Sequence, residues 1–186
     1  APNDPIGFYY AGLVMQAQNK LPESVEQFES ALAVSPDAVQ PLSQLVKSHL
    51  AMDKRDVAEK RLVEVIERNP KNFVAHNLLG EIQLTTKRYE EAKKSFETAI
   101  AANEKWAILY RNLATAKIAL KDEEGAVKTM EEGIEKTGGS SLLVTGLATY
   151  LEKVGKLDQA VQQYEKVLEK DPKSQLAANN LAMLLI

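Results

Sequence analysis

The sequence predicts an all-α fold, an α-solenoid in which five helix-turn-helix repeats of 34 residues are followed by a final unpaired helix. Pro36, Pro70 and Pro172 fall on a 34-residue lattice, and the two remaining places hold Glu104 and Gly138. Small and large apolar residues recur at fixed distances before these places. Each candidate helix also has one narrow apolar stripe, which is typical of a helix that packs on one side only.

The second helix of each repeat carries its apolar residues at three fixed places. A small side chain stands twelve residues before each lattice position: Ser24, Ala58, Ala92, Ala126 and Ala160. A large side chain follows four residues later: Phe28, Leu62, Phe96, Met130 and Tyr164. Three residues further on the chain has Ala31, Val65, Ala99, Gly133 and Val167. Small residues let helices approach closely and large ones fill the space between them, so these helices are expected to pack against their neighbours.

The first helix of each repeat carries a pair of adjacent apolar residues, usually a large one and then a small one: Ala11-Gly12, Leu45-Val46, Leu79-Gly80, Leu113-Ala114, Leu147-Ala148 and Leu181-Ala182. Two kinds of helix therefore alternate along the chain. The expected helices cover about 5–19 and 22–34, 39–52 and 56–69, 73–86 and 90–103, 107–120 and 124–137, 141–154 and 158–171, and 175–186.

Two stretches carry the pattern most completely. Residues 73–106 contain His76, Leu79-Gly80, Tyr89, Ala92, Phe96 and Ala99, and residues 141–174 contain Leu147-Ala148, Gly155, Leu157, Ala160, Tyr164 and Pro172. This pattern resembles the tetratricopeptide repeat family. The chain departs from it at Ser24, at Val46 and at "KTGGSS" (136–141), where Gly138 and Gly139 are expected to end the helix by adopting positive φ.

The predicted organisation is a single array over 1–186, with repeats 5–38, 39–72, 73–106, 107–140 and 141–174 and a half repeat 175–186. Repeat arrays usually end in a polar capping helix, and the last helix here lacks its partner. We therefore expect the chain to be a fragment of a longer protein.

Charge and composition exclude several classes of function. The net charge is −3 with mixed signs along the chain, which disfavours nucleic acid as a partner. No stretch approaches the roughly 18 apolar residues of a membrane span, so membrane insertion is not expected. Without cysteine, thiolate catalysis and cysteine-based metal sites are excluded, and the compartment stays unknown.

Catalysis has little support in the sequence. The two histidines, His49 and His76, lie 27 residues apart at places that usually hold core aromatic residues, and neither has a metal-ligand spacing. Acidic pairs such as Glu90-Glu91 are expected to point into solvent, where they would not act as a general acid or base. We expect no enzyme, no cofactor and no metal.

The resemblance implies a binding surface on the first helices, at the second, fifth, sixth and ninth places of each repeat. The candidate residues are Tyr9, Gln44, Lys47, Asn77, Glu81, Ile108, Arg111, Asn112, Thr145, Asn179 and Asn180. Asn and Gln side chains both donate to and accept from a peptide backbone, and a Lys or Arg can hold a carboxylate. The expected activity is a non-catalytic interaction scaffold whose partner is a protein or peptide held in a concave groove.

Two alternatives remain open at this level. The uncovered apolar residues of the last helix, Leu181, Leu184, Leu185 and Ile186, would join two copies into a homodimer in a self-association module. In the other alternative the chain is the recognition arm of a larger multidomain enzyme whose catalytic domain lies outside this segment.

Overall fold

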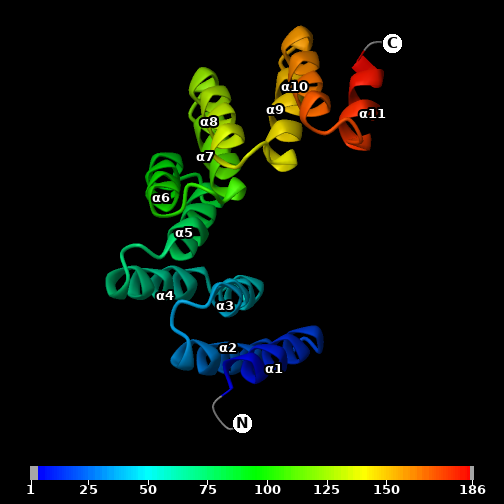
Figure 1. The fold of residues 1–186 in the computed structure, drawn as a ribbon. Coiled ribbons are helices and arrows are strands. Elements are labelled where there is room, and N and C mark those ends of the chain that lie inside the picture. Colours follow the sequence, from blue (N-terminus) through cyan, green and yellow to red (C-terminus); the bar gives the residue numbers. More distant parts are fainter. Residues whose placement is uncertain (1–3, 185–186) are drawn as a thin grey trace. The chain divides into compact units, whose positions relative to one another are not determined.

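A computed structural model describes residues 4–184, which form helices joined by short turns with no strand among them (Figure 1). The helices are α1 Pro5–Ala17, α2 Leu21–Val34, α3 Val39–Ala51, α4 Arg55–Arg68, α5 Phe73–Thr85, α6 Tyr89–Ala102, α7 Ala107–Ala119, α8 Glu123–Lys136, α9 Ser141–Lys153, α10 Leu157–Lys170 and α11 Gln175–Leu184. The predicted all-α class is confirmed. None of these helices has the length and apolar character needed to cross a membrane.

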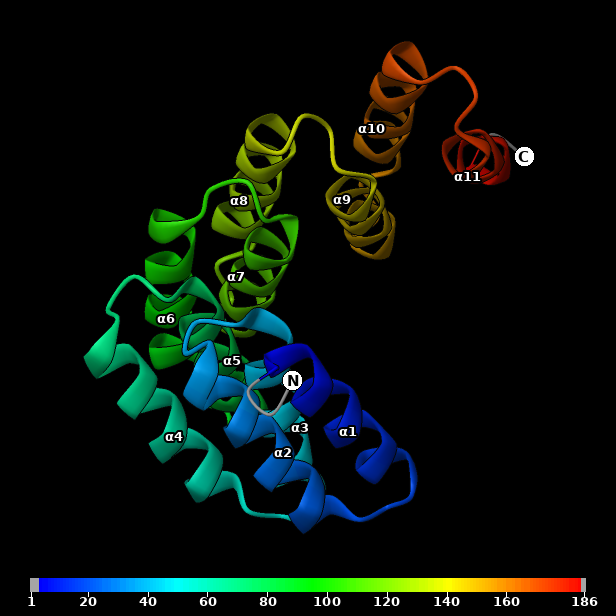
Figure 2. The same ribbon diagram turned by 60° about the horizontal axis from the view of Figure 1, so that its bottom comes forward.

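The chain divides into two compact units, Ala1–Lys87 with α1 to α5 and Arg88–Ile186 with α6 to α11. The boundary falls in the turn between α5 and α6, inside the predicted repeat 73–106. Within each unit, helices that follow one another in the chain pack together, as α1 with α2 and α7 with α8 do (Figures 1 and 2). The single array over 1–186 stays a prediction.

The first unit explains why Ser24 stands where the repeat pattern has alanine. Ser24 is fully buried, and its hydroxyl donates to the carbonyl of Leu21 at 2.7 Å. Its oxygen lies 2.9 Å from Ser48 Oγ, which accepts from Gln16 Nε2 at 3.0 Å. Because the Ser24 proton is already used, Ser48 donates to Ser24. The buried hydroxyls are thus satisfied by a chain of hydrogen bonds that joins α1, α2 and α3.

The second unit is built around a buried cluster in which small and large side chains alternate. Ala126, Ala160 and Ala177 pack with Tyr164 and Met130 in the interior. All five side chains are almost inaccessible to solvent. The predicted small-and-large packing of the second helices is therefore present in this unit.

The turn inside each hairpin repeats one backbone geometry. Residues with φ between 57° and 77° recur every 34 residues: Asn19, Asp53, Lys87, Lys121 and Gly155. This conformation lets the next residue close the helix end, as in the bond from Lys156 N to the Leu151 carbonyl at 2.8 Å. Four of the five are not glycine, although left-handed backbone costs other residues about 1–2 kcal/mol. The packing of the helices therefore holds these four residues in a backbone conformation that non-glycine residues disfavour.

The turn between α8 and α9 has the geometry that its glycines predict. α8 ends at Lys136, and Gly138 and Gly139 follow with φ of 70° and 92°. Positive φ at these two residues is confirmed.

Close packing at Gly133 gives a test of the helix interface. A Cβ at Gly133 would lie 2.5 Å from Tyr110 Cγ and 2.8 Å from Leu143 Cδ1, whereas a Cβ at Gly146 would meet nothing within 4 Å. We expect Gly133→Ala to lower the free energy of unfolding by about 1–2 kcal/mol, because overpacking outweighs the better helix propensity. Gly146→Ala should raise it by about 0.5–1 kcal/mol. Urea unfolding followed by circular dichroism measures both, and a stabilising Gly133→Ala would contradict the packing described.

Candidate functional site

The residues predicted to line a groove lie on the first helices of the repeats, and both units contribute some. In the unit Ala1–Lys87 they lie on α1, α3 and α5: Tyr9, Gln44, Lys47, Asn77 and Glu81. In the unit Arg88–Ile186 they lie on α7, α9 and α11: Ile108, Arg111, Asn112, Thr145, Asn179 and Asn180. Each unit therefore carries its own share of the predicted surface.

In the first unit, α3 and α5 enclose a hollow of about 380 Å³, called here the α3–α5 hollow. Two of the predicted residues, Lys47 and Glu81, line it together, with Leu50 and Leu78 among the apolar lining. The hollow thus offers an apolar floor, an ammonium group and a carboxylate. Such a combination suits an apolar side chain flanked by peptide or charged groups.

Sequence reasoning missed part of this lining. Leu50 and Thr85 also border the α3–α5 hollow, although the repeat pattern does not single them out. Leu50 lies three residues after Lys47, and Thr85 lies four after Glu81. Residues at these spacings share a helix face, so extending the predicted set by one helical turn would have found both.

The other three predicted residues of the first unit make contacts inside the protein or are partly buried. Asn77 is only 3% exposed, and its Nδ2 donates to Glu81 Oε1 at 2.9 Å. It therefore positions the Glu81 carboxylate. Gln44 is half-buried, and its buried Oε1 accepts no hydrogen bond within residues 4–184. The Tyr9 ring packs against Phe28 with centroids 6.2 Å apart.

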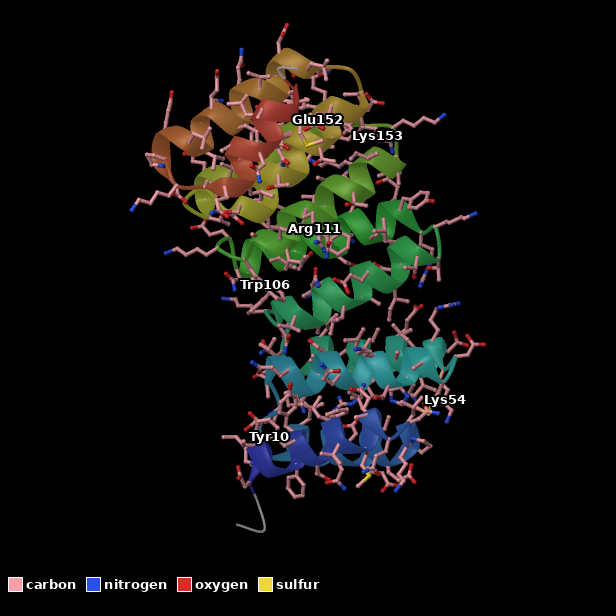
Figure 3. The ribbon with its side chains drawn as sticks, turned by 90° about the vertical axis from the view of Figure 1, so that its right-hand side faces the viewer. Tyr10, Lys54, Trp106, Arg111, Glu152 and Lys153 are labelled. Atoms are coloured by element: carbon pink, nitrogen blue, oxygen red, sulfur yellow. The ribbon has the colours of Figure 1, made fainter. Side chains whose placement is uncertain are left out.

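On α7 of the second unit, one predicted residue is exposed and one is buried. Arg111 projects from α7 (Figure 3), and its Nη2 lies 3.4 Å from Asn112 Oδ1. Asn112 is 6% exposed, so it helps to orient Arg111 more readily than it can contact a partner. Ile108 and Thr145 are half-buried. Arg111 is thus the charged group that this part of the surface offers.

The Asn180 side chain forms its hydrogen bond inside the second unit. Its Nδ2 donates to the Tyr164 hydroxyl at 3.0 Å, and that hydroxyl donates to Glu152 Oε1 at 3.1 Å. Burial raises the pKa of Tyr164 above its ordinary value, which keeps the phenol protonated as a donor. These bonds join α9, α10 and α11. Asn179, the adjacent predicted residue, is exposed.

The residues predicted for self-association lie at the end of the chain. Leu181 and Leu184 are half-buried and pack against the cluster around Tyr164. Leu185 and Ile186 lie outside the described residues. On α11, Met183 is 76% exposed. Self-association through this helix stays a prediction.

Both histidines make contacts within the protein. His49 is buried in the first unit, and this burial lowers its pKa. His76 Nε2 lies 3.0 Å from the Pro70 carbonyl, which can only accept, so the ring donates there. Among residues 4–184, no group of three or more His, Asp or Glu side chains is placed to hold a metal.

Comparisons with known proteins agree with this architecture. A family model described as tetratricopeptide repeat matches residues 43–105 and 145–186. A search of curated proteins finds no match. Similar solved structures include a thermophilic tetratricopeptide repeat protein of Thermus thermophilus, with TM-score 0.68 and 20% identity over 98% of this chain and 99% of that one.

Two further structures have the same fold at low identity. PilF of Pseudomonas aeruginosa gives TM-score 0.68 and 17% identity, covering 87% of this chain and 73% of that one. MamA from Desulfovibrio magneticus gives TM-score 0.64 and 16% identity, covering 92% and 97%. Likeness at this level of identity concerns the fold alone.

The hydrogen bonds of Tyr164 predict a role in holding α11. We expect Tyr164→Phe to speed amide hydrogen exchange across residues 175–184, because the Asn180 amide and the Glu152 carboxylate lose a buried partner at a cost of about 1–2 kcal/mol. Tyr10→Phe, at an exposed ring, is the control and should leave exchange in α11 unchanged. Equal exchange rates in both variants would show that these bonds do not hold the helix.

Proposed function

Because the chain belongs to the tetratricopeptide repeat family, we propose that it is a non-catalytic scaffold that binds a peptide or protein segment along the first helices of its repeats. The fold is one that serves protein–protein interaction. The single observation that supports the proposal best is the α3–α5 hollow, where two residues chosen from the repeat pattern, Lys47 and Glu81, line one depression.

The chemistry of the α3–α5 hollow suits a peptide better than a small polar metabolite. Its apolar floor can hold one aliphatic or aromatic side chain. The Lys47 ammonium donates to backbone carbonyls or to a carboxylate, and the Glu81 carboxylate accepts from backbone N–H groups or from a basic side chain. Since Asn77 bonds to Glu81, that carboxylate is held in place before a partner arrives.

In the second unit, Arg111 supports the same proposal. Its exposed guanidinium offers donors in a planar fork that matches a carboxylate, and the bond to Asn112 restrains it. A segment that binds the α3–α5 hollow therefore carries an apolar side chain, and a segment that binds at Arg111 carries an acidic residue.

Selection from a random peptide display library tests the proposal. Peptides enriched on the wild-type protein should be synthesised with a fluorophore and titrated by fluorescence anisotropy. We expect Lys47→Glu to weaken their binding by about tenfold or more, because a charged hydrogen bond is replaced by repulsion. Lys71→Glu makes the same charge change at an exposed residue of the same unit that does not line the hollow. It should bind like the wild type. Equal loss in both variants, or no loss in Lys47→Glu, would reject the α3–α5 hollow as the binding site.

A further inference from the structure

Two hollows occupy the same place in the repeat pattern, two periods apart. One lies between α2, α3 and α4 in the first unit, with a volume of about 190 Å³. The other, called here the α6–α8 hollow, lies between α6, α7 and α8 in the second unit, with a volume of about 290 Å³. Adding 68 residues to Glu29, Arg61 and Glu64 of the smaller hollow gives the lining residues Glu97, Thr129 and Glu132 of the larger one.

An arginine of the chain itself lies against both carboxylates of the smaller hollow. Arg61 Nε donates to Glu29 Oε1 at 2.7 Å, and its Nη2 donates to Glu29 Oε2 at 2.8 Å. Its Nη1 lies 4.0 Å from Glu64 Oε2. The Arg61 side chain is 19% exposed. The two carboxylates of this place in the repeat thus hold a guanidinium group, one of them with two parallel hydrogen bonds.

The α6–α8 hollow keeps both carboxylates but has no arginine. Thr129 stands at the place of Arg61, and its short side chain leaves the hollow larger. Within residues 4–184, the side-chain carboxylates of Glu97 and Glu132 make no salt bridge and accept no hydrogen bond. Lys117 is turned to other partners, since its Nζ donates to Thr129 Oγ1 at 2.8 Å and lies 3.4 Å from the Gly125 carbonyl.

Charge also differs between the two hollows. In the smaller one, the carboxylates face two permanent cations, Lys60 and Arg61. His49 adds little charge there, because burial lowers its pKa. The lining of the α6–α8 hollow includes one ammonium, that of Lys117, and the Lys136 ammonium also interacts electrostatically with Glu132. The larger hollow therefore lacks the guanidinium side chain that lines the smaller one.

We propose that the α6–α8 hollow binds the arginine side chain of a partner protein, with Glu97 and Glu132 in the roles that Glu29 and Glu64 have toward Arg61. Lysine fits less well, because an ammonium cannot make the two parallel bonds that a carboxylate and a guanidinium share.

This site is separate from the first-helix surface of α7. Its α7 lining includes Tyr110, Leu113 and Lys117, whereas the groove prediction uses Ile108 and Arg111. At 100° per residue, Tyr110 lies about 200° around the helix from Ile108. The two surfaces therefore face different sides of α7, and either can fail its test without the other.

Titration of the ¹⁵N-labelled protein with Nα-acetyl-arginine amide, followed by NMR, tests the proposal. We expect saturable shift changes at residues 97–101, 110–117 and 129–132, and binding of the matching lysine amide at least about fivefold weaker. Glu97→Gln should weaken binding of the arginine probe about tenfold, because it removes a charged acceptor. Glu131→Gln, at an exposed residue outside the hollow, is the matched control and should leave the affinity unchanged.

The variant Thr129→Arg places an arginine at the position equivalent to Arg61, so that it can pair with Glu97 as Arg61 pairs with Glu29. Its own guanidinium should occupy the hollow and abolish the shifts caused by the probe, with the helix content unchanged by circular dichroism. If this variant does not fold, the comparison of Glu97→Gln with Glu131→Gln tests the proposal without it. Equal binding of the arginine and lysine probes, or equal effects of the two Glu→Gln variants, would overturn the proposal. Tighter binding of free arginine than of the blocked form would also overturn it, because a partner's arginine has no free amino or carboxyl group.

Discussion

The structure depends on one constraint, which is that neighbouring helices meet at places with room only for small side chains. Ala58 in the first unit and Ala126 and Ala160 in the second are fully buried at the same place of the repeat. A side chain added at Gly12 would collide with the Phe28 ring. Since an isolated hairpin cannot cover its apolar stripe, each hairpin is stable only against its neighbours, and the spacing between helices is set by these small residues.

The surfaces that remain for binding follow from this packing. Both helices of a hairpin bury residues against their neighbours, yet Lys47 on α3 and Arg111 on α7 are exposed. The second helices also leave hollows beside the neighbouring hairpins. The equivalent places of two such hollows hold Arg61 in the first unit and Thr129 in the second.

Much of the fold could be predicted from the sequence, because period, small residues and apolar stripes all specify the backbone. The helix ranges and the positive φ of Gly138 are examples. The left-handed turn residues Asn19 and Lys87 were missed, because no glycine marks those turns. Asn77 and Asn180 were placed on the correct helices, but repeat position does not reveal that each amide bonds inside the protein.

The most direct test of the packing constraint compares two alanine-to-leucine substitutions in the first unit. Ala58 is fully buried on α4, whereas Ala33 is exposed on α2. We expect Ala58→Leu to lower the free energy of unfolding by about 1–3 kcal/mol in urea titrations, because the helices cannot separate to admit the larger side chain. Ala33→Leu should change it by less than about 0.5 kcal/mol. Equal and small effects of both substitutions would show that small side chains do not set the spacing between the helices.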